Sequence, residues 1–199
     1  GWPPMPGHGH EDLGSFELHD EDRPLIIDPG RGTYNDSLYS AARLHNYLTI
    51  DEAGPLAVNR PYYSANYRNR VIGKPPFVSL TRTGAVLTTN GFKRLRGVGA
   101  ASREWCFYED RLEIVDRIEG TGTHRIQRCL HTMARSIVEG SGVKLVLGDT
   151  EYSVFSDCPA AVNNVHCFTE YARARPGFQI VFDRSVSLPF KGRTVITRL

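Results

Sequence analysis

The stretch FVSLTRTGAVLTTN, at residues 77–90, decides the fold. It contains two runs rich in apolar and β-branched residues, at 77–82 and 85–90, with Thr83-Gly84 between them. Because β-branched residues favour extended backbone and glycine favours a tight turn, this pattern predicts two short strands joined by a hairpin.

The same pattern continues to the C-terminus. Turns containing glycine or aspartate recur at short intervals, and no helical spacing of apolar residues runs for more than about two turns. Many short strands joined by turns are typical of an antiparallel sandwich. We therefore predict an all-β fold, a large antiparallel β-sandwich, as a single domain over residues 1–199. The further strands expected are residues 101–109, 111–118, 123–133, 143–148, 151–156, 165–174, 178–183 and 193–198.

Three shorter strands are predicted in the first fifty residues. Residues 15–19 and 45–51 alternate between apolar and polar side chains, and residues 25–28 form an apolar run that ends at Pro29-Gly30. The acidic residues 20–22 predict a hairpin turn, which makes the strands at residues 15–19 and 25–28 neighbours.

Composition narrows the classes of function. The chain has 40% hydrophobic and 23% charged residues, which is ordinary for a globular protein, and its net charge of +2 is too small to indicate nucleic-acid binding. No apolar run approaches the roughly 20 residues that span a bilayer. The four cysteines contain no C-x-x-C pair, so a zinc ribbon is not expected, and a disulfide between Cys158 and Cys167 is left open.

The segment His8-Gly9-His10-Glu11-Asp12 concentrates two imidazoles and two carboxylates in five positions. In extended chain, the two histidines of H-x-H point to the same face. Asp28 and His45 lie on or next to neighbouring predicted strands, and zinc held by three such ligands keeps one position open. His10, Asp28 and His45 are therefore candidate zinc ligands. The alternative is that the two histidines of H-x-H form a solvated pair.

Acid–base chemistry is a second interpretation of this segment. A histidine titrates near neutral pH, and the glycines beside His8 allow close approach to a ligand. Asp12 is a candidate support that orients a histidine through a hydrogen bond, with a turn carboxylate as the alternative. Among the other histidines, His166 is expected in the core, and whether His131 faces a site is left open.

Residues 52–76 form a long irregular segment with several Pro, Asn and Gly residues, and loops of this length are often functional. Arg60, Tyr63 and Arg68 in this segment suit stacking on a polar ligand and hydrogen bonding to it. The alternative is a surface loop held by its own aromatic residues.

Three motifs occur in a fixed order near the N-terminus. They are H-x-H-x-D-x-x-S-F at residues 8–16, D-P-G-x-x-x-Y at 28–34 and H-N-x-x-x-x-D at 45–51. In this order they resemble the motifs of the heparinase II/III-like polysaccharide lyases. The match is strong over residues 7–51 and weaker to about residue 133. Three motifs in order are far more specific than any one alone.

The resemblance implies an enzyme that cleaves uronate-containing polysaccharides by β-elimination. It also implies a metal, usually zinc, on His10, Asp28 and His45, with His8 facing the substrate. Removing the weakly acidic proton next to a uronate carboxylate requires that the carboxylate be neutralised and that a base be held close. Since Tyr or His suits the base, His8 and Tyr34 are the catalytic candidates. The candidates for binding the acidic polysaccharide or oligosaccharide are Asn46, Arg60, Tyr63 and Arg68.

In that family, a helical (α/α) toroid precedes the sandwich and carries further catalytic residues. This chain begins seven residues before the H-x-H motif, so we expect the C-terminal sandwich alone, with the toroid as a missing partner and the isolated domain inactive or forming half of a cleft. The resemblance implies a bacterial-type protein that is periplasmic or secreted. It does not distinguish glycosaminoglycan from alginate. A non-catalytic carbohydrate-binding module and a zinc hydrolase are the alternative functions.

Overall fold

The computed structural model describes residues 10–32, 37–56, 75–170 and 173–199. Strands dominate these ranges, and the all-β prediction is confirmed. The helical segments within them are three short 3-10 turns: η1 (Ser37–Ser40), η2 (Ala42–Leu44) and η3 (Gly91–Arg94). No helix in the described part of the chain is long and apolar enough to cross a membrane.

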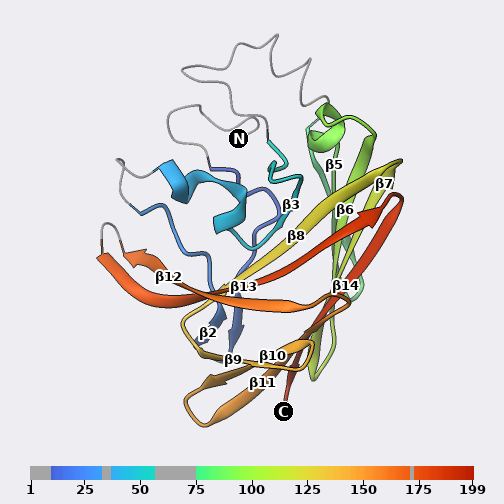
Figure 1. The fold of residues 1–199 in the computed structure, drawn as a ribbon. Coiled ribbons are helices and arrows are strands. Elements are labelled where there is room, and N and C mark those ends of the chain that lie inside the picture. The colour runs from blue at the N-terminus through green and yellow to red at the C-terminus, as the bar shows by residue number, and fades with distance from the viewer. Residues whose placement is uncertain (1–9, 33–36, 57–74, 171–172) are drawn as a thin grey trace.

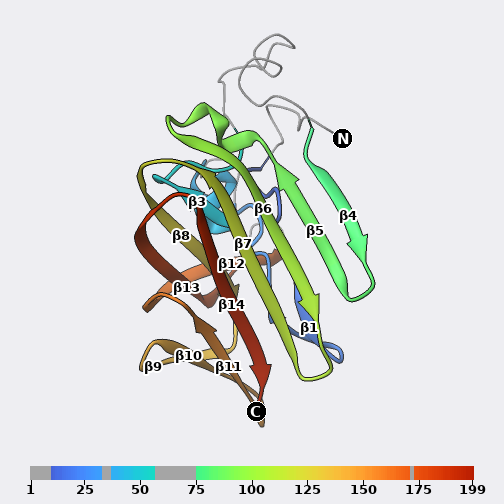
Figure 2. The ribbon, with the colours of Figure 1, turned by 90° about the vertical axis from the view of Figure 1, so that its right-hand side faces the viewer.

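Two antiparallel sheets face each other across the core (Figure 1). The larger has eight strands in the order β4-β5-β6-β7-β14-β11-β10-β9, and Figure 2 shows β4 to β7 and β14 side by side. Its strands are β4 (Phe77–Thr81), β5 (Gly84–Thr89), β6 (Val98–Phe107), β7 (Arg111–Gly120), β9 (Arg135–Glu139), β10 (Gly142–Leu147), β11 (Thr150–Ser156) and β14 (Phe190–Arg198).

The smaller sheet has four strands in the order β12-β13-β8-β3. They are β3 (Leu48–Ile50), β8 (Thr123–Thr132), β12 (Ala160–Glu170) and β13 (Arg173–Ser187). A separate hairpin consists of β1 (Leu18–Asp20) and β2 (Arg23–Ile26), where the acidic turn predicts one.

The predicted strands differ from the observed ones where side chains are polar. β9 was not predicted, because its alternation is weak and it is largely exposed at the edge of the larger sheet. β13 extends well beyond the predicted residues 178–183, since its pairing with β8 continues to Ser187 and its pairing with β12 reaches back to Arg173. His166 is exposed on β12, so the prediction that it lies in the core is wrong. All four cysteines are free thiols.

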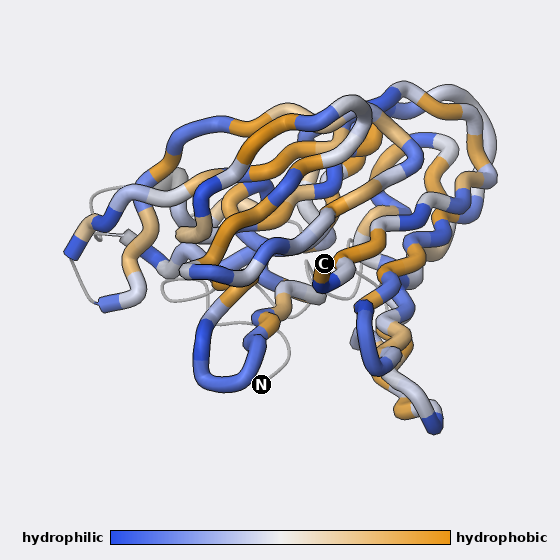
Figure 3. The backbone as a smooth tube through the Cα atoms, turned by 90° about the horizontal axis from the view of Figure 1, so that it is seen from below, coloured by the Kyte–Doolittle hydropathy of each residue, from blue (hydrophilic) through white to orange (hydrophobic). Residues whose placement is uncertain are grey.

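Two hydrophobic clusters fill the core between the sheets. The first surrounds Leu145 and Phe182, and the second surrounds Tyr47 and Phe92, all four of which have no exposed surface. Trp105 packs against both clusters. Hydrophobic and hydrophilic residues follow one another along the strands in Figure 3, as expected when one face of each sheet is buried.

Strand β8 brings the motif-bearing segments together. On one side, β3 pairs with it antiparallel, so the chain that leads into β3 is held against the smaller sheet. The segment after β2 also lies along β8, because Ile27 N donates to His131 O at 2.9 Å and Thr132 Oγ1 donates to Leu25 O at 2.6 Å. The residues that follow Ile27 and those that precede Leu48 therefore lie next to each other.

Candidate functional site

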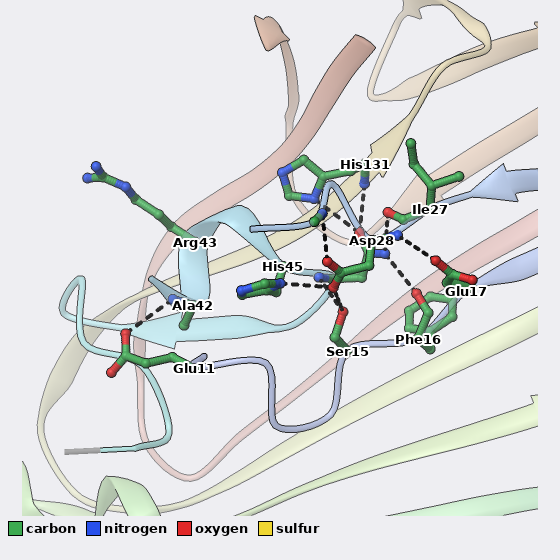
Figure 4. Close-up of polar contacts among 12 residues, drawn as sticks. Glu11, Ser15, Phe16, Glu17, Ile27, Asp28, Ala42, Arg43, His45 and His131 are labelled. Atoms are coloured by element: carbon green, nitrogen blue, oxygen red, sulfur yellow. Dashed lines mark hydrogen bonds and ion pairs between the residues drawn. The ribbon is translucent and has the colours of Figure 1, made fainter. Parts of the chain in front are cut away.

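Asp28 and His45 form the centre of the candidate site (Figure 4). His45 Nδ1 lies 2.8 Å from Asp28 Oδ2, and the histidine side chain has no exposed surface. Ser15 Oγ donates to the same carboxylate oxygen at 2.8 Å, and Gly30 N donates to Oδ1 at 3.0 Å. The carboxylate is thus held by three donors from three separate parts of the sequence.

These donors decide the charge of Asp28. Burial raises the pKa of Asp28, but the hydrogen bonds from His45, Ser15 and Gly30 outweigh burial and lower the pKa to about 2. The ionised carboxylate accepts, so His45 Nδ1 carries the hydrogen and donates it. In the neutral form of the ring, the other nitrogen, Nε2, is then free to accept a hydrogen bond or to bind a metal.

His45 Nε2 is buried and has no hydrogen-bond partner among the described residues. The His10 ring lies beside it, with the two ring centroids 5.4 Å apart and the planes tilted by 33°. Burial lowers the pKa of His10, and the neighbouring His45 lowers it further. Two histidines therefore lie next to one carboxylate, and this is a donor set that suits zinc.

The predicted zinc ligands thus lie together, yet they do not form a closed metal site. Within the described ranges, no group of three or more His, Cys, Asp or Glu side chains has the arrangement of a metal site. The 2.8 Å separation of His45 Nδ1 and Asp28 Oδ2 is the length of a direct hydrogen bond between the two side chains. Zinc binding by this set stays a prediction.

Glu11 lies in the same region, although no role is predicted for it from the sequence. Its Oε2 accepts from Ala42 N at 3.2 Å, and its own backbone N donates to Ser40 O at 2.9 Å. Burial raises the pKa of Glu11. The residue after His10 is thereby attached to the turn that precedes His45.

Asn46, which was predicted to bind substrate, lies inside the protein. It has no exposed surface, and its side-chain amide bonds to Phe16 O, Ile27 O and His131 within the protein. This placement gives no support to direct contact with a substrate, which stays a prediction. The H-N motif reveals that an asparagine follows His45, but not that β8 covers it.

The remaining candidates divide into two groups. Asp12 is exposed, and its carbonyl accepts from Ser15 N at 2.8 Å in a turn, while its charge acts to raise the pKa of His10. Its predicted support role is limited to this electrostatic effect in the structure. The others lie outside the described residues: His8, Tyr34, Arg60, Tyr63 and Arg68.

Sequence reasoning missed Ser15 and Gln179 as parts of this region. Ser15 Oγ donates to the Asp28 carboxylate and accepts a hydrogen bond from Asn46 N at 3.1 Å. The fixed position of this serine in H-x-H-x-D-x-x-S was a usable signal. Gln179 reaches the region from β13, and no local pattern around it marks a site.

Fold and site together define a large antiparallel β-sandwich domain that carries a buried histidine–carboxylate pair with a second histidine beside it. A family model described as "Heparinase II/III-like, C-terminal" matches residues 1–194. The chain belongs to this family. A search of curated proteins finds no match.

Solved structures with the same fold include several heparinases. The heparan sulfate lyase HepC of Pedobacter heparinus superposes with a TM-score of 0.71 at 15% identity, over 96% of this chain and 31% of that chain. A heparinase III gives a TM-score of 0.72 at 15% identity, over 96% of this chain and 30% of that one. This chain therefore spans about a third of the length of these structures. At such identities the likeness concerns the fold.

A putative aldose 1-epimerase of Escherichia coli K12 also shares the sandwich architecture. Its TM-score is 0.52 at 7% identity, over 95% of this chain and 94% of that chain. A sandwich of this kind is thus found in proteins named for different activities, so function has to be argued from the site.

Proposed function

We propose that this chain is the C-terminal sandwich of a polysaccharide lyase that cleaves a uronate-containing polysaccharide by β-elimination. The observation that carries the proposal is the convergence of the family motifs: Asp28 and His45 are 2.8 Å apart, and the His10 ring lies beside them. Family membership over residues 1–194 supports it.

The reaction determines what the residues must do. A base removes the proton next to the uronate carboxylate, the freed electron pair forms the ring double bond, and the bond to the leaving oxygen breaks as that oxygen gains a proton. His8 and Tyr34 are the candidate proton carriers of this chain. The roles proposed for Arg60, Tyr63 and Arg68 are to bind the acidic sugar and to neutralise its charge.

A zinc site is the second part of the proposal. His10, Asp28 and His45 would hold the ion, and two imidazoles beside an ionised carboxylate are a donor set that suits zinc. Bound zinc would connect the three motif segments and place positive charge near an anionic substrate. The protein's own contribution is the fixed orientation of His45, which Asp28 and Ser15 maintain.

Zinc addition to metal-free protein tests the metal part. At a zinc concentration of 100 times the dissociation constant, binding is expected to stabilise the fold by about 2.7 kcal/mol, seen as a higher melting temperature. His45→Ala should lose this response, and His10→Ala should lose most of it. His19→Ala is the matched control, since His19 is exposed on β1 and should keep the full response. A wild-type protein without stoichiometric zinc or a zinc response would contradict the metal part.

A lyase assay tests the reaction class through the ultraviolet absorbance of the unsaturated uronate product, with heparan-type and alginate-type polymers as substrates. Activity of the chain alone or with an added toroid domain supports the lyase. Binding without cleavage in both cases would instead support a carbohydrate-binding module, and cleavage without the new double bond would indicate hydrolysis. A polymeric substrate argues for action in the periplasm or outside the cell.

A further inference from the structure

The Asn46 side chain has every hydrogen-bonding position of its amide occupied inside the protein. Its Nδ2 donates to Phe16 O at 2.7 Å and to Ile27 O at 2.8 Å. Its Oδ1 accepts from His131 N at 2.8 Å and lies 3.1 Å from His131 Nδ1. Two carbonyls on one side and a backbone N–H on the other fix which way the amide points.

This orientation of Asn46 determines the tautomer of His131. Because Asn46 Oδ1 only accepts, His131 Nδ1 carries the hydrogen, and Nε2 is left as an acceptor. Gln179 Nε2 lies 3.2 Å from that nitrogen and also donates to Arg43 O at 2.6 Å. Burial lowers the pKa of His131 to about 3, so the ring is neutral at physiological pH.

The hydrogen bonds form a circuit around His45. They run from Arg43 O through Gln179 and His131 to Asn46, and Arg43 and Asn46 lie on either side of His45 in the chain. The same asparagine also holds the carbonyl of Ile27, which precedes Asp28. Both members of the Asp28–His45 pair are thus attached to one fixed network.

We propose that Gln179, His131 and Asn46 are positioning residues that set the orientation of the His45 ring toward Asp28. None of the three needs to contact a substrate for this role. The contacts above hold the backbone on both sides of His45 and at Ile27, and the effect on zinc binding or on the reaction rests on the proposed function.

Gln179 offers the cleanest test, because it is only partly buried and lies at the end of the circuit. Gln127 on β8 is a matched control: it is also a partly buried glutamine of the smaller sheet, but it donates to Asp183 at 3.0 Å, outside the circuit. We expect Gln179→Leu and Gln127→Leu to remain folded with similar losses of stability. Asn46→Asp is a second variant, since a carboxylate there cannot donate to Phe16 O and Ile27 O.

The readout is the imidazole nitrogen resonances of His45 and His131 in the metal-free 199-residue chain, measured by long-range proton–nitrogen correlation. In the wild type, the His131 ring should show hydrogen on Nδ1 and a bare Nε2. In Gln179→Leu, the His45 resonances should shift and its Nδ1 hydrogen should exchange roughly fivefold faster or more, as expected when one supporting hydrogen bond is lost. Gln127→Leu should leave both unchanged.

Two results would overturn the proposal: unchanged His45 resonances in Gln179→Leu, or equal changes in Gln127→Leu. Zinc affinity is measured separately, and a supporting residue of this kind is expected to change it about 10- to 100-fold. If the wild type binds no zinc, the metal part of the proposed function fails. The resonances of the metal-free protein still decide whether the circuit orients His45.

Discussion

Arg103 is buried beneath the segment that contains His45, and one carboxylate matches its charge. Its Nε and Nη2 atoms donate to Asp116 at 2.7 and 3.0 Å, and Nη1 donates to Asn46 O at 2.8 Å. The guanidinium also lies over the Tyr47 ring, 4.6 Å from its centroid. Arg103 is 2% exposed and Asp116 is 0% exposed. If either side chain were removed, water could not solvate the charge that remains.

Removal of this carboxylate should therefore be severe. Asp116→Ala is expected to lower the free energy of unfolding by about 3–5 kcal/mol, since it leaves Arg103 buried without its counter-ion. Urea denaturation of wild type and variant measures the difference. The double variant Arg103→Met with Asp116→Leu should recover part of the loss, because it removes both buried charges.

The control for Asp116→Ala lies on the same two strands. Arg117 on β7 pairs with Glu104 on β6 at 2.8 Å, but on the exposed face. Arg117→Ala should lower stability by less than about 1 kcal/mol, because solvent screens exposed ion pairs. Comparable losses for Arg117→Ala and Asp116→Ala would contradict the role given to burial.

At the scale of elements, β8 and β13 are joined by charged side chains as well as by backbone hydrogen bonds. Arg125 Nε lies 3.0 Å from both carboxylate oxygens of Asp183, and Gln127 Nε2 donates to one of them at 3.0 Å. The hydrogen bond from Arg125 lowers the pKa of Asp183, against the opposing effect of burial. This pair adds a side-chain contact to the backbone pairing of β13 with β8.

The lowered pKa of Asp183 predicts a pH-dependent contribution to stability. A carboxylate with a depressed pKa in the folded state stabilises fully above its unfolded pKa, near 4, and loses that effect as pH falls through the folded value. Asp183→Asn should lower stability by about 0.5–1 kcal/mol at neutral pH, and the difference should shrink below about pH 4. Urea denaturation at a series of pH values measures it.

Glu170→Gln serves as the control for this pH series. Glu170, the last residue of β12, forms exposed ion pairs with Arg173 and Arg175 of β13. Its replacement should have little effect on stability at any pH. If the deficit of Asp183→Asn were constant from pH 7 to pH 2, ionisation of Asp183 would not be its cause.

At the scale of the whole molecule, Trp105 connects the two hydrophobic clusters. It packs against both, and its ring meets Phe16 edge to face at a centroid distance of 6.2 Å. The residues near the Asp28–His45 pair thus share a core with the distant strands β10 and β11. A sandwich connected in this way is expected to unfold as one cooperative unit.

Trp105→Ala should lower the free energy of unfolding by about 3–5 kcal/mol, through lost burial and the cavity that remains. It should also separate the transitions of the two clusters, measured by comparing far-ultraviolet circular dichroism with the fluorescence of labels placed near each cluster. Leu80→Ala is the control, because Leu80 on β4 is 84% exposed and should contribute little. A small loss with coincident transitions would show that Trp105 does not couple the clusters.

Much of the fold was predictable from local pattern. Residues 77–90 became β4 and β5, and the acidic turn near residue 21 became the β1–β2 hairpin, because alternation and turn chemistry act over a few residues. β9 was missed because its alternation is weak and it is largely exposed. For the candidate site, the sequence predicted which residues belong to it but not which atoms they contact, because a motif identifies residues and carries no information on their distant partners.

The sequence by itself determined the all-β class, the family and the residues that converge as the candidate site: His10, Asp28 and His45. Only the tertiary structure decided that Asn46 is buried and bonded to His131, 85 positions along the chain, and that Gln179 holds Arg43 across 136 positions. The physical reason is strand register. Gln179 and His131 are partners only because β13 pairs with β8 in one alignment, and a shift of β13 by one residue would turn Gln179 to the other face of the sheet, away from His131.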